Sequence, residues 1–153
     1  MIDRRGSKGA RDYLVARAGT LADGGIPNPA LLDQLAKHGE IQLNSAQFWA
    51  ATQQGALAYR AGRYDEAEAL FERSLKTDAS PGRAVVNWLW LSLTLQRLGK
   101  AEEAITRLTR AQNWLDQYRD GLPPDVEAST GLHLHNWLEA NVLRREAETM
   151  LLK

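Results

Sequence analysis

Histidine is a residue type that can support metal binding or acid–base chemistry, and the chain has three: His38, His133 and His135. Two histidines that hold one zinc ion from a single helix stand four positions apart, so that both lie on the same face. His133 and His135 are two positions apart and are expected to point to different sides of a helix. His135 and Glu139 are four apart, but such a pair stabilises a helix by only about 0.2–0.5 kcal/mol. The histidines therefore predict no metal site.

Adjacent carboxylates occur twice, as Asp65-Glu66 and as Glu102-Glu103. Paired carboxylates can work as acid and base, but both pairs fall in the first turn of an expected helix, where negative charge complements the helix dipole. We interpret them as structural. The sequence has no G-x-S-x-G motif, no phosphate-binding glycine loop and no cysteine. We therefore expect a protein that is not an enzyme and that uses no cofactor.

The charge balance argues against a nucleic-acid ligand. The chain has 19 basic and 19 acidic side chains and a pI of about 6.8, whereas a surface that gathers phosphates needs a basic excess. Two short basic clusters are interpreted as solvated surface: Arg4, Arg5, Lys8 and Arg11, and Arg144 with Arg145.

No segment has the character of a membrane anchor. The longest nearly apolar stretch, Val85 to Leu95, is shorter than the roughly 20 residues that a spanning helix needs. The basic N-terminal residues are not followed by the apolar block of a secretory signal. The lack of cysteine suits a reducing compartment. We expect a cytoplasmic protein without a membrane partner.

The elements that must position any site are expected to be helices. A chain of 153 residues with 44% hydrophobic and 25% charged residues suits one globular domain, and its apolar residues follow the helical period between proline and glycine breaks. The expected helices are about Ala10 to Ala22, Pro29 to Ile41, Ser45 to Gly62, Tyr64 to Thr77, Pro81 to Gly99, Ala101 to Tyr118, and a last helical region ending near Leu152.

An internal repeat is the most informative feature of the sequence. Aligning Gly62 with Gly99 places GALAYRAGRYDEAEALFERSL over SLTLQRLGKAEEAITRLTRAQ, at an offset of 37 positions. Small residues fall where two helices would approach closely, glycines fall at the turn between them, and large apolar residues fill the space between repeats. The residues expected to pack the repeats are Gly55, Gly62, Ala67 and Phe71, and then Trp88, Leu91, Ser92, Leu95, Gly99, Ala104, Leu108 and Ala111.

These positions resemble the tetratricopeptide-repeat (TPR) family over Phe48 to Asp78 and Val85 to Gln112. Ala51, Gln54 and Ala58 stand where the family prefers a large aromatic residue, leucine and tyrosine. The stretches YRAGRYDEAEALFERSL, NWLWLSLTLQRLGKAEEA and LRREAETMLL also resemble the C-terminal helical region of large bacterial multidomain proteins that carry kinase or WD40-type propeller domains.

The resemblance implies an all-α, TPR-like right-handed α-solenoid of antiparallel helix pairs that ends in a capping helix. The parts expected within one domain, 1–153, are a basic tail (1–9), a degenerate helix pair (10–43), a repeat (45–78), a second repeat (81–119) and a capping helical region (124–153).

In this family the first helix of each pair lines a concave groove that binds a peptide. The matching residues are Trp49, Thr52, Gln53, Ala56, Tyr59 and Arg60 from one repeat and Val86, Leu89, Trp90, Leu93, Gln96 and Arg97 from the next. An apolar floor with arginines at its rim suits an amphipathic helix, or an extended apolar peptide with an acidic edge. Thr52 and Ala56 stand where a Lys/Asn clamp would grip a terminal carboxylate, so we predict against that ligand. The alternative is that these large residues are core.

The last helical region has two apolar stripes. Trp137, Ala140, Leu143, Ala147 and Leu151 share one face; Leu134, Leu138 and Val142 form a second stripe at i, i+4 and i+8. A helix that is apolar on two sides must be covered on two sides. The leading hypothesis is thus a protein-interaction scaffold. The alternative is a structural module that packs on an upstream domain or self-associates, so that the chain is either a monomer or a homodimer.

Overall fold

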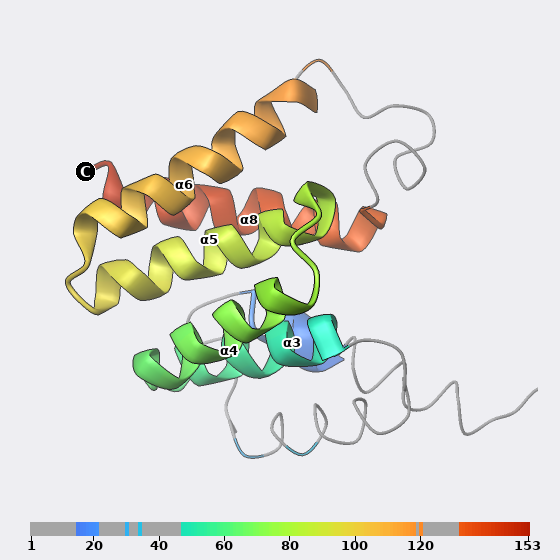
Figure 1. Ribbon diagram of the computed structural model, residues 1–153, viewed down its shortest axis with the longest axis vertical. Helices are drawn as coiled ribbons and strands as arrows, with labels where there is room; N and C mark the ends of the chain where they lie inside the picture. The colour runs from blue at the N-terminus through green and yellow to red at the C-terminus, as the bar shows by residue number, and fades with distance from the viewer. Residues whose placement is uncertain (1–14, 22–29, 31–33, 35–46, 119, 121–131) are drawn as a thin grey trace, which may run out of the picture. The chain divides into compact units, whose positions relative to one another are not determined.

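The computed structural model describes residues 15–21, 30, 34, 47–118, 120 and 132–153 (Figure 1). Every regular element among these residues is a helix, which confirms the all-helical class. Residues 15–19 are helical. The main elements are α3 (Gln47–Arg60), α4 (Tyr64–Thr77), α5 (Pro81–Arg97), α6 (Ala101–Leu115), the 3-10 turn η1 (Asp116–Tyr118) and α8 (Leu134–Leu151).

The chain divides into two compact units, residues 1–74 and 75–153, where the sequence analysis expected one domain. The first unit contains α3 and most of α4, and the second contains α5, α6 and α8. Several predicted parts lie outside the described residues. They are the basic tail, which includes Arg4, Arg5, Lys8 and Arg11, most of the degenerate helix pair with His38, and residues 124–131.

The helix starts follow from local sequence signals. α4 has the bounds that the sequence predicts, and α5 begins at Pro81, whose fixed φ suits the first helical position. Ser80 holds the cap position but its hydroxyl makes no capping bond. Its backbone N–H instead donates to Asp78 Oδ1 at 2.8 Å. This hydrogen bonding with Ser80 lowers the pKa of Asp78, and the nearby Arg83, at 3.2 Å, acts in the same direction.

The two helix-to-helix turns have the same hydrogen bonds, 37 positions apart. Gly62 and Gly99 both have a φ of 76°, in the left-handed region that glycine adopts without strain. In the first turn the Gly62 N–H donates to Tyr59 O at 3.0 Å and the Arg63 N–H to Ala58 O at 2.9 Å. This is the Schellman pattern of a helix C-terminus. The second turn repeats it, from Gly99 to Gln96 O (3.1 Å) and from Lys100 to Leu95 O (2.9 Å).

The hairpin of α3 and α4 is held together by the ring of Phe71 and by the hydroxyls of Thr52 and Ser74. Phe71 of α4 packs against the backbone of α3 at Gly55, so closely that a Cβ on the glycine would lie 2.6 Å from the ring. The hydroxyls of Thr52 and Ser74 lie 2.9 and 2.8 Å from the carbonyl oxygen of Phe48 and 3.0 Å from each other. All five residues are buried. The pairing of α3 with α4 therefore depends on a small residue facing a large one.

The second unit is built around α5, which packs against α6 and against α8 (Figure 1). All its residues from Ala84 to Leu95 are buried, including Asn87, Ser92 and Thr94. A helix that is buried all round must be covered on more than one side, and here α6 and α8 supply that cover. None of the described helices combines the length and the apolar character that spanning a bilayer requires.

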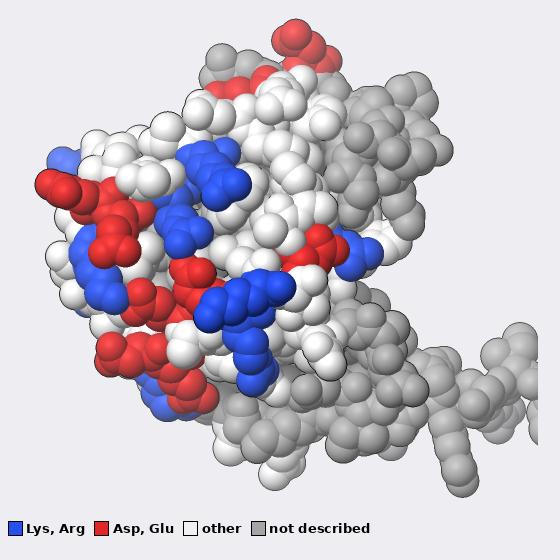
Figure 2. Space-filling model, viewed as in Figure 1, with Lys and Arg blue, Asp and Glu red and all other residues white. Residues whose placement is uncertain are grey.

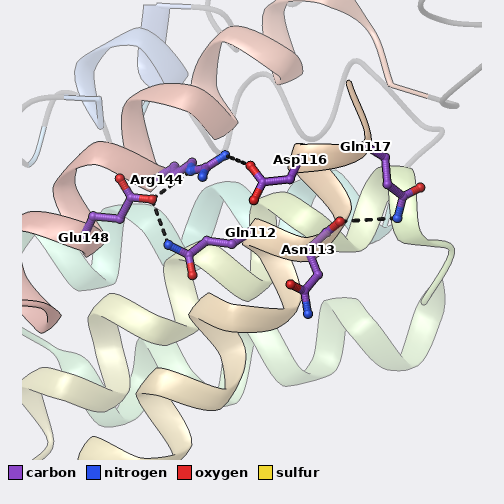
Figure 3. A network of polar contacts seen from close by, with 6 residues as sticks. All are labelled: Gln112, Asn113, Asp116, Gln117, Arg144 and Glu148. Carbon is purple, nitrogen blue, oxygen red and sulfur yellow. Dashed lines mark hydrogen bonds and ion pairs between the residues drawn. The ribbon is translucent and has the colours of Figure 1, made fainter. Parts of the chain in front are cut away.

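A polar network ties α8 to the end of α6 (Figure 3). Arg144 Nε and Gln112 Nε2 both donate to Glu148 Oε1 at 2.8 Å, and Arg144 also donates to Asp116 Oδ1 at 2.8 Å. The Arg144 hydrogen bond lowers the pKa of Glu148, with a smaller contribution from Gln112. The Glu148 bond in turn raises the pKa of Arg144. We call these four residues the α6–α8 clamp.

An aromatic cluster adds to this attachment. Trp137 of α8 lies with its ring centroid 5.9 Å from that of Tyr118 and 6.5 Å from that of Trp114. Tyr118 belongs to η1, so the chain after Leu115 continues as a 3-10 turn rather than as the longer α-helix that the sequence predicted. The turn brings its tyrosine against α8.

Candidate protein-binding surface

The groove residues predicted at the two ends of α3 contact the N-terminal segment. The guanidinium carbon of Arg17 lies 4.8 Å from the ring centroid of Trp49. Arg60 donates from Nε to the backbone oxygen of Thr20 at 2.7 Å and lies 5.3 Å from the ring centroid of Tyr59. Trp49 and Arg60 are only partly buried. Both therefore help to hold residues 17–20 in the first unit.

The groove residues in the middle of α3 have little or no exposed surface. Thr52 is engaged with Ser74 of α4, as described above. Gln53 is buried, and its Nε2 has no hydrogen-bond partner. Ala56 and Tyr59 are also buried. The middle of the groove part that α3 was predicted to supply is thus closed to solvent.

The apolar floor that the sequence assigns to α5 is also buried. Four of its residues have no exposed surface at all, namely Val86, Leu89, Trp90 and Leu93. The indole Nε1 of Trp90 donates to Glu139 Oε1 of α8 at 3.3 Å. Arg97, expected at the rim, is exposed. At Trp90 the structure therefore has the arrangement that the sequence analysis gave as the alternative, a large side chain in the core, here hydrogen-bonded to α8.

The face of α8 that is buried carries polar side chains among its apolar ones. Glu139 is 4% exposed and Asn136 is 1% exposed, and neither the Nδ2 nor the Oδ1 of Asn136 has a hydrogen-bond partner. Ala140, Leu143 and Ala147 share this face and are fully buried. The sequence carried no sign of the Trp90–Glu139 bond, because the two residues are far apart in the chain and glutamate is common on exposed helix faces.

The second apolar stripe of α8 is exposed. Leu134 and Leu138 are each 57% exposed and Val142 is 40% exposed. Their spacing places them along one line on the helix. We call these three residues the outer stripe. The exposed side of α8 thus carries an apolar stripe, and its buried side is partly polar.

The residues expected to pack the repeats occupy three kinds of place. Gly62 and Gly99 are exposed at the two turns. Trp88 is buried, with the guanidinium carbon of Arg110 lying 4.2 Å from its ring centroid. The other members are buried in the hairpins, and they are Gly55, Ala67, Phe71, Leu91, Ser92, Leu95, Ala104, Leu108 and Ala111.

The two C-terminal histidines do not point apart, so that expectation was wrong. The rings of His133 and His135 are stacked, with centroids 5.5 Å apart and planes 10° from parallel. The reason is that His133 precedes α8 in an extended conformation and does not follow the helical spacing. Among the described positions, no group of three or more His, Cys, Asp or Glu side chains is arranged to hold a metal ion.

The paired carboxylates lie where the sequence placed them. Asp65 and Glu66 are in the first turn of α4, and Glu102 and Glu103 are in the first turn of α6. All four are exposed. Figure 2 shows acidic and basic side chains interspersed over the described residues of one face.

No family model, curated protein or solved structure matches the chain. The described residues define an all-helical protein that contains two helical hairpins with the same turn geometry.

Proposed function

We propose that the protein is a non-catalytic scaffold that binds a helical or peptide segment of a partner protein on the surface of α5. The observation that carries the proposal is the seating of α8, a helix that packs on α5 and whose Glu139 accepts a hydrogen bond from Trp90. A surface that receives one helix has the shape and the apolar character to receive another. The repeated hairpin, with its Schellman turns 37 positions apart, supports a TPR-like organisation within the same proposal.

The chemistry of the ligand can be inferred from α8. Its buried face has small residues at Ala140 and Ala147, an apolar anchor at Leu143 and a carboxylate at Glu139 that accepts from an indole N–H. A partner segment with small and apolar residues on one face and an acidic residue beside them would make the same contacts. The exposed Arg97 in the last turn of α5 favours an acidic edge. The balanced charge of the chain favours a protein partner over nucleic acid, and the lack of cysteine favours the cytoplasm.

The proposal can be tested by selecting ligands from a displayed library of amphipathic helices against the full chain. We expect the selected helices to share an acidic residue next to an apolar face. Trp90→Phe keeps an aromatic ring and removes the N–H donor for α8 and for the ligand alike. The unchanged chain should prefer an acidic ligand about tenfold over a matched ligand with glutamine at the acidic position, as expected for a hydrogen bond to a charged group, and Trp90→Phe should abolish this preference.

Circular dichroism and urea unfolding must show that Trp90→Phe keeps its fold, because Trp90 is fully buried. A folded Trp90→Phe variant that keeps the full preference for the acidic ligand over the glutamine ligand would place binding elsewhere. If no helix in the library binds more tightly than scrambled sequences do, the proposed function as a helix-binding scaffold would be contradicted.

A second candidate function is structural, and the outer stripe favours it. Leu134, Leu138 and Val142 would be covered if α8 packed on an upstream domain or on a second copy of the chain. Three side chains form a small patch compared with the roughly 1,200–2,000 Å² that a stable interface buries. Light scattering should detect a dimer that Leu138→Asp abolishes if the chain self-associates through this stripe, and a concentration-independent monomer if it does not.

A further inference from the structure

The buried face of α8 is imperfectly matched to its surroundings. Asn136 has no partner for either polar atom of its side chain, although it is almost wholly buried. Asn136 and Glu139 are three positions apart and so share a face. A buried amide without a partner loses the hydrogen bonds that water would give it. The docked position of α8 is therefore destabilised at a specific residue.

The outer stripe adds a second mismatch. Leu134 and Leu138 are more than half exposed, whereas Asn136 between them is buried. A helix that belonged permanently to the core would be expected to place its leucines inward and its asparagine outward. Leaving α5 would return the amide of Asn136 to water, and it would free the outer stripe to pack elsewhere. The polarity of α8 suits a helix that has more than one position.

Besides its packing on α5, α8 has polar and aromatic contacts with the end of α6 and with η1. The α6–α8 clamp joins Arg144 and Glu148 to Gln112 and Asp116, and Trp137 packs on Trp114 and Tyr118. Trp90 of α5 donates a hydrogen bond to Glu139 of α8 at 3.3 Å, so that α8 is attached to both α5 and α6. Loss of the α5 contacts would thus leave α8 tethered to α6 and close to the surface that it had covered.

We propose that α8 is a displaceable internal ligand, which occupies the surface of α5 until an amphipathic helix of the partner replaces it. This inference rests on the proposed function and adds its regulation. Binding is opposed by the free energy of removing α8, so that changes in α8 tune the affinity of a ligand that never touches α8. The occupant of the surface in the free protein is the chain's own helix.

Hydrogen exchange on the full chain, with no ligand present, tests whether α8 opens by itself. We expect the amides of residues 138–147 to exchange faster than those of α5, through local opening. Asn136→Leu removes the orphaned amide and should slow exchange in α8 by about tenfold. Leu138→Gln, a matched change on the outer stripe, should leave exchange in α8 nearly unchanged. Exchange of α8 and α5 at one common rate, in the unchanged chain and in Asn136→Leu alike, would overturn the proposal.

A synthetic peptide of residues 132–153 serves as the ligand in a second test, because it carries the α8 sequence itself. Labelled with fluorescein, it should bind the full chain by exchange with α8, and Asn136→Leu in the chain should weaken that binding by about tenfold. Leu143→Asp in the peptide alters the buried face and should abolish binding. Leu138→Asp in the peptide alters the outer stripe and should not. The reverse order for the two peptides would show association through the outer stripe and would overturn the proposal.

The helices selected against the full chain separate this inference from the proposed function. If they bind the unchanged chain and Asn136→Leu with equal affinity, the scaffold function stands and the displacement of α8 is refuted. If no helix is selected but the amides of α8 still exchange faster than those of α5 and the α8 peptide still binds, then α8 is displaceable and the proposed binding of a helical partner is refuted.

Discussion

The ring of Phe71 fills the space that a side chain at Gly55 would need. A Cβ at residue 55 would lie 2.6 Å from Cε1 and 2.8 Å from Cδ1 of that ring. The positions 37 residues later hold Ser92 and Leu108, so the second hairpin has a larger residue on its first helix and a smaller one on its second. The two hairpins divide the volume between their helices differently.

Gly55→Ala should destabilise the protein, by about 1–3 kcal/mol, because the added methyl group overpacks a buried ring. Alanine would otherwise gain up to about 1 kcal/mol in the middle of a helix, so a loss shows that the contact with Phe71 outweighs helix propensity. Urea unfolding of the two proteins measures the difference in the free energy of unfolding.

Phe71→Leu provides the matched test of the same contact. The single change should also destabilise, because it leaves space beside a glycine. The double variant Gly55→Ala/Phe71→Leu restores the pairing of a small residue with leucine, and it should be at least about 1 kcal/mol more stable than the sum of the single effects implies. Strict additivity would mean that the two positions do not share one volume.

Gly62→Ala should cost about 1–2 kcal/mol for a different reason. A Cβ at Gly62 would meet nothing within 4 Å, but the residue has a φ of 76°, which is unfavourable for alanine. Gly62→Asn should cost less, because asparagine tolerates this conformation. Thermal unfolding of both variants, and of the same pair at Gly99, measures the effect. Equal losses for alanine and asparagine would point to a cause other than the backbone angle.

The turns and most helix limits could be predicted because their causes are local. Gly62 and Gly99 terminate helices through their own backbone conformations, and Pro81 starts one through its fixed φ. Each signal lies within a few residues of its effect. The bounds of α4 could therefore be predicted from a single stretch of sequence.

Whether the candidate surface is exposed or covered could not be predicted in the same way. Trp90 and Leu93 have the spacing of an apolar helix face. The same spacing occurs in a helix that exposes a binding surface and in a helix that packs in the core. Whether the face is covered depends on α8, and the residue that reaches Trp90 is Glu139, an ordinary surface residue by composition. The stacking of His133 on His135 was missed because the helix starts after His133.

Asn136→Leu should raise the free energy of unfolding by about 1–3 kcal/mol. The substitution replaces a buried amide that has no hydrogen-bond partner with an apolar side chain of similar size. Asn141→Leu is a useful comparison, since Asn141 Nδ2 donates to the Trp137 carbonyl oxygen at 2.9 Å. Removing this hydrogen bond should not raise the free energy of unfolding. Urea unfolding measures both. A loss of stability in Asn136→Leu would contradict this prediction.

The contribution of Glu148 to stability should depend on pH. Its pKa is held below the ordinary value of 4.5 because Arg144 and Gln112 donate to its carboxylate, so the folded chain binds this proton less readily than the unfolded chain does. The stabilisation is therefore complete above about pH 4.5 and is lost as the pH falls through the lower pKa of the folded state. Glu148→Gln should lower the free energy of unfolding at pH 7 by up to about 1 kcal/mol, and the difference should shrink below pH 4.5.

Arg144→Gln supplies the control for that pH dependence. Without the guanidinium, the largest cause of the lowered pKa of Glu148 is removed. Adding Glu148→Gln to Arg144→Gln should then change stability by a smaller amount that varies little between pH 3 and pH 7, the range in which a free glutamate, with a pKa of about 4.3, changes its charge. An undiminished pH effect in this background would assign it to another group.

The short span of the hydrogen bonds at the two turns bears on how the protein assembles. The bond that joins Arg63 to Ala58, and its counterpart from Lys100 to Leu95, each connect residues five positions apart. Closing such a short stretch loses little chain entropy, and proteins rich in local contacts fold in microseconds to milliseconds. We therefore expect the two turns to form early in folding, before contacts between distant parts of the chain.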